Sequence, residues 1–507
     1  MRSFSRLTRL TRLGVATALA ASLVGGLTVA VAAPAAAASA ALPGWLHTSG
    51  ATIKTAKNKP YVIKAVSWFG MELASCAPHG LWQISLDEGM ASIKSMGFNT
   101  VRVPFSNECL AAPKTDTINA LLNPKLFGKT GLETLDAVVA RAQAYGLNVI
   151  LDRHRPSSSA QSALWYTKAY PEKKWISDWT MLAKRYKSFT NVIGVDLHNE
   201  PHKPACWGCG VKSKDWQAAA TRAGNAIHKV NKNLLIVVEG IEDITQSYKT
   251  TWGGALGAVA KHPVTLKVKN HVVYSPHDYP QSVHAQAFYK KAGWAKKLAA
   301  AWDRNFGYIV KKKIAPVLIG EFGSKFATAN DKSWMKAMIS YLKKNRMSWA
   351  YWTFNPNSSS TGGLVKDDWV TKDAVKLAAL KPLLGAGTSV TVLEPRPTFT
   401  TQPPTGPVPE GQAATWMLGD GWNGGYVAQL SVSSSTPLTH WTVMIADPYA
   451  TKVISTWGVV CSLVPGGILC TGDDWGVAID AGQRQLVGIV VQSALPPVNP
   501  ALTVTGS

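Results

Sequence analysis

The chain has 507 residues, of which 46% are hydrophobic and 16% charged, so it is not a disordered protein, which would be poor in apolar residues and rich in charge. Its length suits two or three domains, or one barrel of about 250 residues or more with an accessory module. A net charge of +23 favours a polyanionic partner such as nucleic acid, an anionic membrane or an acidic polymer, whereas the 20 Trp favour a flat ligand.

Residues 1–39 have the features of a secretory signal peptide. Four arginines precede an apolar run over residues 13–31, and an alanine-rich stretch follows over residues 32–41. This order predicts cleavage near residue 39 and a secreted, extracellular protein that does not associate with a membrane after cleavage. An uncleaved membrane anchor is the alternative, because the apolar run approaches the length that spans a bilayer.

The six cysteines suit disulfide bonds, which export permits. Proximity in the sequence favours Cys206–Cys209 and Cys461–Cys470, which leaves Cys76 with Cys109. The Cys206-Trp-Gly-Cys209 motif would also suit a redox pair or half of a zinc site, but a single C-x-x-C is weak evidence for either. We therefore expect three structural disulfide bonds.

Charge and composition divide the rest of the chain into three segments. Residues 40–385 hold 46 Lys and Arg against 23 Asp and Glu, whereas residues 411–507 hold two basic and five acidic residues. Residues 386–410 are rich in Pro, Thr and Gly and have no apolar periodicity, which predicts an extended, semi-rigid linker. We expect a large catalytic domain over 40–385, this linker, and a small module over 411–507.

The large segment alternates apolar runs with amphipathic stretches of helical period. The predicted strands are 61–69, 100–105, 148–152, 192–198, 234–239, 271–275, 316–320 and 349–354. The predicted helices are 86–96, 132–145, 176–188, 216–230, 294–310 and 334–344. Near-continuous apolar strands indicate parallel pairing with both faces buried, so we predict an α/β fold, a (β/α)8 TIM barrel. A doubly wound sheet is the alternative, but no G-x-G-x-x-G motif follows the first strand.

The C-terminal segment has a different pattern. It is rich in Val, Thr, Ser and Gly, with short alternating runs at 427–432, 441–445, 452–457 and 485–491. Turn residues separate these runs at short intervals. This pattern predicts a small all-β sandwich.

Polar side chains stand where the predicted barrel strands end, which is where TIM barrels carry their active sites. They are two Glu, three His, an Arg, an Asn and a Trp: Arg102, His154, His198, Asn199, Glu200, His277, Glu321 and Trp352. A single carboxylate at a strand end is most often a solvated rim charge. So many polar groups converging on one rim indicate a site.

Glu200 and Glu321 are the candidate pair for glycosidic bond cleavage. They follow the fourth and seventh strands, so they would face each other across the barrel mouth. In this chemistry one carboxylic acid protonates the leaving oxygen, and the other carboxylate attacks the anomeric carbon or activates water. Arg102 would keep a neighbouring carboxylate ionised, Asn199 would hold a sugar 2-hydroxyl, and Trp352 would stack on a sugar ring.

The motifs at these strand ends are Val101-Arg-Val-Pro, Asp152-Arg-His-Arg-Pro, His198-Asn-Glu-Pro, His277-Asp-Tyr and Gly320-Glu-Phe-Gly. Together they resemble glycoside hydrolase family 5, and more closely its actinobacterial endo-β-1,4-glucanases, over about residues 43–384. The resemblance implies a retaining, endo-acting hydrolase of cellulose and related β-glucans that needs no cofactor. A β-mannanase or xyloglucanase of the same fold is the alternative.

The resemblance also implies roles for individual residues. Glu200 would be the acid/base and Glu321 the nucleophile. The family's other active-site positions fall on Arg102, His154, Asn199, His277, Tyr279 and Trp352, and its glucan platforms on Trp82 and Trp252. Relatives pair the Cys76 equivalent with a cysteine in a loop where this chain has Ser157, Ser158 and Ser159, so a bond to Cys109 departs from the family.

The tail carries its own set of tryptophan motifs, Gly421-Trp-Asn-Gly-Gly-Tyr, His440-Trp-Thr, Thr456-Trp-Gly and Asp474-Trp-Gly. They resemble those of a family 2 carbohydrate-binding module. The resemblance implies a core Trp441 and a surface row, Trp422, Trp457 and Trp475, that anchors the protein to cellulose. Three ordinary core tryptophans are the alternative. The tail departs from the family because it lacks the cysteine pair that ties the module's ends.

Two other functions would suit parts of this sequence. Lysine clusters at 290–291, 296–297, 311–313 and 343–344 would suit a polyanion-binding cell-wall protein with an inactive barrel, but they lie away from the strand ends and accompany no nucleic-acid motif. His198 and His202 are four residues apart, but His198 ends a strand, so the spacing does not form a helical zinc motif. We expect no metal, no nucleic-acid partner and a monomer.

Overall fold

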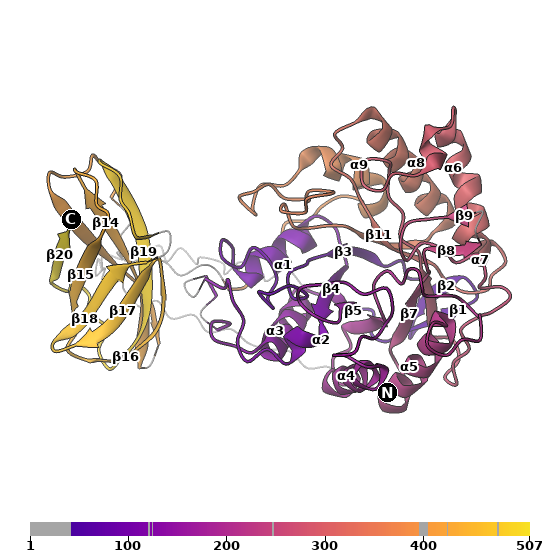
Figure 1. Ribbon diagram of the computed structural model, residues 1–507, viewed down its shortest axis with the longest axis horizontal. Helices are drawn as coiled ribbons and strands as arrows, with labels where there is room; N and C mark the ends of the chain where they lie inside the picture. Colours follow the sequence, from indigo (N-terminus) through magenta and orange to yellow (C-terminus); the bar gives the residue numbers. More distant parts are fainter. Residues whose placement is uncertain are drawn as a thin grey trace, which may run out of the picture. The chain divides into compact units, whose positions relative to one another are not determined.

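A computed structural model describes residues 42–119, 122–123, 125–245, 248–394, 404–422, 424–473 and 476–507 (Figure 1). The predicted signal peptide lies outside these residues. No helix in the described part of the chain is both long enough and apolar enough to cross a membrane.

Eight parallel strands form the sheet of the first domain, in the order β10-β7-β6-β5-β4-β3-β12-β11. Their bounds are β3 Lys64–Ser67, β4 Thr100–Ser106, β5 Asn148–Arg155, β6 Val192–Asp196, β7 Leu235–Glu239, β10 Val272–Ser275, β11 Leu318–Phe322 and β12 Ser348–Tyr351. Two parallel bridges, Tyr274 to Val317 and His277 to Glu321, join the first strand of this order to the last. The sheet is thus a closed barrel, and the predicted TIM fold is confirmed.

Helices surround the barrel (Figure 1). They are α1 Leu86–Ser95, α2 Asn107–Leu110, α3 Gly131–Ala144, α4 Glu172–Arg185, α5 Trp216–Val230, α6 Trp294–Trp302, α7 Tyr308–Lys311, α8 Ala329–Asn345 and α9 Ala374–Leu384. Their starts follow from local chemistry. Ser85 and Glu88 form a reciprocal capping box at α1, and Thr130 and Glu133 form another at α3.

The helix predicted over 294–310 is interrupted by a π-helical turn, Asp303–Gly307, between α6 and α7. Tyr341 of α8 approaches at this point, and its hydroxyl donates to Asp303 Oδ1 at 2.7 Å. A Cβ atom at Gly307 would lie 1.8 Å from that hydroxyl. A side chain that packs into the helix at a glycine explains why the regular α-helix does not continue.

A hairpin that the sequence prediction missed packs beneath the barrel. It consists of β1, Leu46–Ser49, and β2, Thr52–Thr55. Leu46 and Ile53 join a buried apolar cluster with residues from the barrel strands, such as Ala65 and Ile150. The short strands lie outside the βα repeat, so the repeat pattern gave no signal for them.

Most tryptophans of this chain are core residues. Within the described residues, 12 of the 20 are buried: Trp68, Trp165, Trp175, Trp179, Trp207, Trp216, Trp302, Trp334, Trp349, Trp369, Trp416 and Trp441. By contrast, Trp82 and Trp252 are 37% and 40% exposed. The high Trp content therefore reflects packing in the first place, and only a minority of these rings are available to a flat ligand.

The tail consists of two four-stranded antiparallel sheets, as predicted for a β-sandwich. One sheet has the order β13-β14-β19-β16, with bounds Gln412–Trp422, Gly425–Ser434, Gln483–Ser493 and Ala450–Trp457. The other has the order β17-β18-β15-β20, with bounds Val459–Val464, Gly467–Gly472, Trp441–Ala446 and Leu502–Gly506. Trp441 lies in the buried core of the sandwich.

The structure forms three disulfide bonds, Cys76–Cys109, Cys206–Cys209 and Cys461–Cys470. The last joins directly opposite residues of β17 and β18.

Part of the predicted linker lies along the barrel. After α9, the backbone N–H of Leu393 donates to the Tyr145 hydroxyl at 2.7 Å, and Glu394 pairs with Arg141 at 3.4 Å. Residues 395–403 lie outside the described residues.

Gly89 in α1 offers a test of barrel packing. Alanine normally stabilises a helix interior relative to glycine, but a Cβ here would lie 2.0 Å from the Trp68 ring. Trp68 cannot move away easily, because its Nε1–H donates to the His79 carbonyl at 2.8 Å. Gly89→Ala should lower the free energy of urea unfolding by about 1–3 kcal/mol. Ser92→Ala on the same helix, which adds no atom, is the control; equal stability of both variants would contradict this packing.

Candidate active site

Arg102 of β4 is the electrostatic centre of the barrel. It is fully buried and contacts four carboxylates, Asp152, Asp196, Glu239 and Glu321, at N–O distances of 3.1, 3.1, 3.1 and 2.7 Å. Burial alone would lower the pKa of the guanidinium, but these carboxylates raise it well above its usual value. Arg102 is therefore a permanent cation at the ends of neighbouring strands.

Glu321 of β11 is held at both carboxylate oxygens. Arg102 donates to Oε1 at 2.7 Å, and the Tyr279 hydroxyl donates to Oε2 at 2.7 Å. Burial and the nearby Glu321 carboxylate raise the pKa of Tyr279 well above its usual value, so the phenol keeps its proton and remains a donor. The two donors hold the Glu321 carboxylate in a fixed orientation.

Glu200 follows β6 and is half-buried. Its Oε1 lies 3.1 Å from His277 Nδ1, and its Oε2 accepts from Gln161 Nε2 at 3.2 Å. One carboxylate oxygen of Glu200 and one of Glu321 lie within 4.8 Å of each other. The structure thus brings together the two carboxylates that the sequence pairs.

His277 follows β10 and lies among the acids. Its Nδ1 faces Glu200, and its Nε2 is 3.2 Å from Glu239 Oε1. Burial would lower the pKa of His277, but the charges of Glu239 and Glu321 outweigh it and raise the pKa well above the usual value. The imidazole is accordingly a cation that neutralises part of the acid cluster.

Three more predicted residues line the same site. Asn199 Oδ1 accepts from Arg102 at 3.0 Å, which leaves its amide nitrogen as a donor for a ligand. His154 Nδ1 lies 2.6 Å from Asp152 Oδ2, and burial lowers the pKa of His154 to about 4. The Trp352 ring is nearly parallel to that of His154, with the centroids 5.4 Å apart.

The two predicted platforms are exposed rings with fixed supports. The Trp82 ring makes edge contacts with His79 and Trp369 at centroid distances of 5.3 and 5.4 Å. The Trp252 ring stacks on His202 at 3.9 Å with an interplanar angle of 8°. Because His202 Nδ1 lies 2.8 Å from the Glu200 carbonyl oxygen, the Trp252 platform is tied to the backbone of Glu200.

Comparison with known proteins identifies the family. A sequence profile described as cellulase, glycosyl hydrolase family 5, matches residues 56–358. The chain belongs to this family. An endoglucanase of Paenibacillus polymyxa is 45% identical over 356 residues, covering 69% of this chain and 90% of that protein. The major extracellular endoglucanase of Xanthomonas campestris pv. campestris is 36% identical over 339 residues, covering 65% of this chain and 69% of that protein.

Solved structures agree with this assignment. The catalytic domain of the Xanthomonas campestris enzyme superimposes with a TM-score of 0.64 at 35% identity, covering 67% of this chain and all of that domain. A cellotetraose complex of the endocellulase from Pyrococcus horikoshii gives a TM-score of 0.64 at 34% identity, covering 68% of this chain and 99% of that one. The protein is a glycoside hydrolase of the endoglucanase type.

Several residues of this family 5 site were missed in the sequence. Gln161 contacts Glu200, and Asp196 and Glu239 end β6 and β7 beside Arg102. A signal existed for the two acids, because each is a charged residue that closes an apolar strand. Gln161 lies on a loop, in a stretch that resembles the family, Gln161-Ser-Ala-Leu-Trp-Tyr, but this stretch does not indicate its contact with Glu200.

His198, which the sequence placed on the rim, has both ring nitrogens engaged by the protein. Nδ1 lies 2.8 Å from Arg153 and Nε2 lies 3.0 Å from the Ser162 carbonyl oxygen. It is fully buried and supports the neighbouring loop.

Of the three tail tryptophans, the structure describes the side chain of Trp457. Its ring lies over Gly488 of β19, where a Cβ atom would come within 1.8 Å of Trp457 Cζ2. Glycine at this position lets the indole lie flat on the sheet. The backbone of Trp422 pairs with Gly425, its side chain is outside the described part, and Trp475 is outside it altogether.

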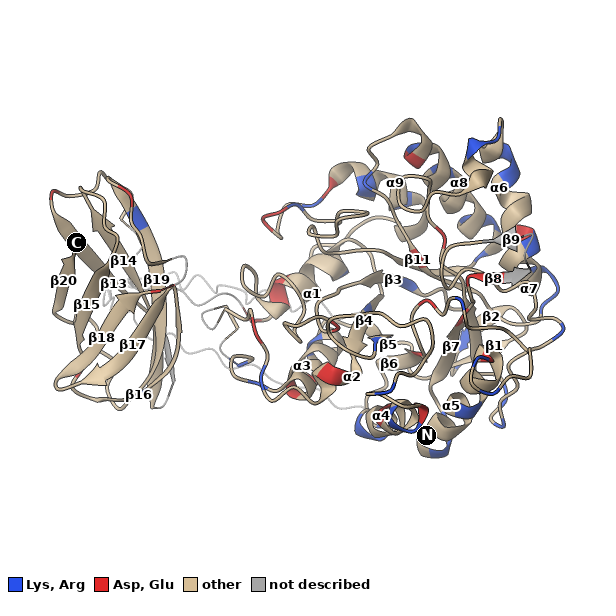
Figure 2. Cartoon of the chain, viewed as in Figure 1, with Lys and Arg blue, Asp and Glu red and all other residues tan. Residues whose placement is uncertain are grey.

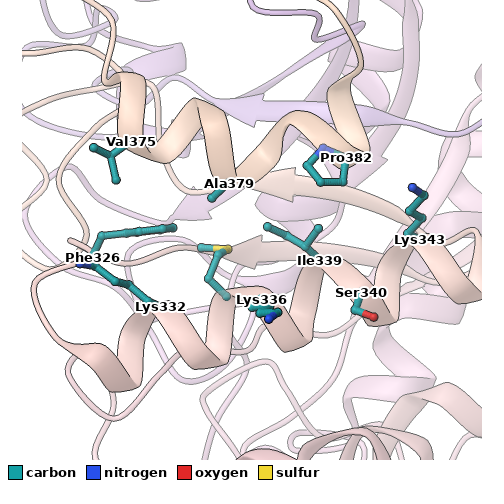
Figure 3. A pocket seen from close by; sticks show the side chains of 10 residues that line it. Phe326, Lys332, Lys336, Ile339, Ser340, Lys343, Val375, Ala379 and Pro382 are labelled. Carbon is teal, nitrogen blue, oxygen red and sulfur yellow. The ribbon is translucent and has the colours of Figure 1, made fainter.

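The basic residues of the barrel lie mainly on its outer helices and loops (Figure 2). Three lysines, Lys332, Lys336 and Lys343, line a groove of about 600 Å³ between α8 and α9 (Figure 3). The other lining residues are Phe326, Met335, Ile339, Ser340, Val375, Ala379 and Pro382. The lining contains no carboxylate, so this groove does not supply an acid/base pair.

The buried acids around Arg102 make stability depend on pH. Burial raises the pKa of Asp196 from 3.8 to about 6, despite the attraction of Arg102. The folded protein therefore binds this proton more tightly than the unfolded chain, and the resulting stabilisation is complete at low pH and lost as the pH rises towards 6. Asp196→Asn has no carboxyl group to ionise, so it does not lose this stabilisation. As the pH rises from about 4 to 7, the free energy of urea unfolding of the variant should therefore increase by about 3 kcal/mol relative to that of wild type.

Asp367→Asn, at an exposed position, is the matched control. Its stability difference from wild type should stay constant over the same pH range. A constant difference for Asp196→Asn as well would show that Asp196 is ionised throughout and would contradict the assignment.

Proposed function

We propose that this protein is a secreted, endo-acting, retaining glycoside hydrolase that cleaves internal β-1,4-glucosidic bonds of cellulose and related β-glucans. The observation that carries the proposal is the short gap between Glu200 and Glu321, whose nearest oxygens are within 4.8 Å. Carboxyl groups about 5–5.5 Å apart are typical of retaining enzymes, whereas inverting enzymes leave about 6.5–9.5 Å for a water molecule. The printed names of the similar proteins, endoglucanase and endocellulase, support the choice of substrate.

Glu321 is the nucleophile in this proposal. Arg102 and Tyr279 donate to its two oxygens, which fixes the direction of the carboxylate. It attacks the anomeric carbon and forms a covalent glycosyl-enzyme. Its ester bond is then broken by water, which restores the carboxylate.

Glu200 is the acid/base. It gives its proton to the departing glucoside oxygen in the first step, and it takes a proton from the attacking water in the second. The amide nitrogen of Asn199 donates to the sugar 2-hydroxyl, and His154 and Trp352 form the wall against which the reacting ring lies. Trp82 and Trp252 bind further glucose units by stacking on their apolar faces.

The tail module anchors the enzyme to cellulose. Trp457, flat over Gly488, supports this role, and Trp422 and Trp475 complete the proposed row. Three disulfide bonds suit an oxidising, extracellular compartment, and one similar protein is named an extracellular endoglucanase.

A panel of soluble substrates tests the activity. Carboxymethylcellulose and mixed-linkage β-glucan should be hydrolysed with a rapid fall in viscosity, and Glu200→Gln and Glu321→Gln should each lose at least about 100-fold in kcat/KM. Glu108→Gln, at an exposed barrel position, is the control and should retain activity. Activity confined to mannan or xyloglucan would replace the substrate assignment, and full activity of either Glu variant would refute the catalytic pair.

Trp457→Ala tests the anchor. Loss of one stacking platform should weaken binding to insoluble cellulose about 10-fold. Hydrolysis of soluble carboxymethylcellulose should stay at the wild-type level, because the barrel is unchanged. Tyr449→Ala removes an aromatic ring of the tail that is 52% exposed, whereas Trp457 is half-buried, and should leave binding intact. Equal cellulose binding by wild type and Trp457→Ala would exclude Trp457 from the anchor.

A further inference from the structure

Resting on the proposed function, we propose that Glu239 is a positioning residue for the acid/base Glu200. Glu239 ends β7 and is fully buried. It contacts the backbone of Glu200 directly and reaches the Glu200 carboxylate through His277. The two contacts together fix where the acid/base stands and how readily it gives up its proton.

The direct contact holds the backbone of Glu200. The Glu200 N–H donates to Glu239 Oε2 at 2.7 Å, and Glu200 has a φ of 53°, in the left-handed region. Such a backbone persists only when its surroundings favour it, because it costs about 1–3 kcal/mol in a non-glycine residue. Gly253 packs against the same contact: a Cβ there would lie 2.6 Å from Glu239 Oε2 and 3.2 Å from Glu200 Cα.

The indirect contact runs through a single imidazole. Glu239 Oε1 is 3.2 Å from His277 Nε2, and His277 Nδ1 is 3.1 Å from Glu200 Oε1. Both ring nitrogens therefore lie close to carboxylates, Nδ1 in a hydrogen bond and Nε2 in an ion-pair contact without hydrogen-bond geometry, and the two negative charges favour the doubly protonated ring. Glu239 contributes to this protonation, because its charge is among the causes that raise the pKa of His277; burial raises the pKa of Glu239 itself well above its usual value and the charge of His277 opposes this, so the two side chains compete for a proton.

The charged groups around His277 come from several strands. Glu200 follows β6, Glu239 ends β7, and Glu321 of β11 lies 3.5 Å from Nδ1. Arg102 of β4 contacts Glu239 and Glu321, but it does not pair with the Glu200 carboxylate among the described contacts. His277 is thus the cation that faces the acid/base directly.

The consequence concerns proton donation by Glu200. Burial would raise the pKa of Glu200, but the hydrogen bond and charge of His277 outweigh it and lower the pKa. If Glu239 loses its charge, His277 loses one reason to be protonated, and Glu200 then faces a less positive ring. The pKa of Glu200 then rises, and without the Glu239 contact to its backbone the carboxyl group no longer stays in place beside the leaving oxygen, so cleavage that depends on protonation of that oxygen slows.

Asp196 offers a matched comparison. Like Glu239, it is a fully buried carboxylate that ends a strand and contacts Arg102 at 3.1 Å. It makes no described hydrogen bond or ion pair with Glu200 or His277, although its charge and that of His277 interact at longer range. Asp196→Asn and Glu239→Gln therefore both remove a carboxyl group from Arg102, but only the second removes the contacts to the Glu200 backbone and to His277.

The experiment compares aryl β-cellobiosides with a good leaving group, 2,4-dinitrophenol, and a poor one, phenol. A good leaving group needs little protonation, and kcat/KM reports the steps up to departure of the phenol. Glu239→Gln should lose about 100-fold in kcat/KM on the phenyl substrate and less than about 10-fold on the dinitrophenyl substrate. The alkaline limb of its kcat/KM profile should move to higher pH, because Glu200 is a weaker acid.

Asp196→Asn should lose a similar factor in kcat/KM on both substrates. The alkaline limb of its kcat/KM profile should stay at the same pH as in wild type. Glu239→Asp, which keeps the charge but shortens the side chain, should show a smaller selective loss than Glu239→Gln and supplies the test if Glu239→Gln does not fold. Losses independent of the leaving group in both Glu239 variants, with an unmoved limb, would overturn the inference. If the wild-type enzyme hydrolyses neither of the two cellobiosides and no β-glucan, the proposed function itself is refuted.

Discussion

The buried guanidinium of Arg102 is the interaction on which the active site depends. It contacts Asp152, Asp196, Glu239 and Glu321 inside a barrel that excludes water. Leaving any of these acids without a partner would be costly, and removing the cation would take a charged partner from all four and leave Asp196 without a described hydrogen-bond partner. The same guanidinium orients Asn199, so one side chain fixes the candidate nucleophile and a substrate-binding amide together.

Barrel closure brings the remaining groups to this centre. The bridge from His277 to Glu321 lies where β10 meets β11, so closing the sheet also sets the candidate nucleophile beside the imidazole. His277, which follows β10, in turn faces Glu200. Glu200 follows β6, and β6 lies two strands from β10 in the sheet order. The geometry of the carboxylate pair is therefore a property of the whole barrel and not of one loop.

Much of the fold was predictable because its signal is periodic. Each of the eight predicted strands overlaps a barrel strand, and the motifs after them contain Arg102, Glu200 and Glu321. The hairpin β1–β2 was not predictable, because its two short strands are stabilised by packing against the barrel strands, and the local sequence does not show this contact. Gln161 and His202 were missed for a similar reason: their roles come from contacts across loops, to Glu200 and Trp252, that no local pattern records.

The central claim is that Glu321, held by Arg102 and Tyr279, attacks the sugar directly across the short gap from Glu200. The anomeric configuration of the first product tests it, followed by proton NMR immediately after the enzyme is added to a soluble cello-oligosaccharide. We predict that the β-anomer appears first and that the α-anomer accumulates only by later mutarotation. Initial formation of the α-anomer would show inversion and would contradict the account.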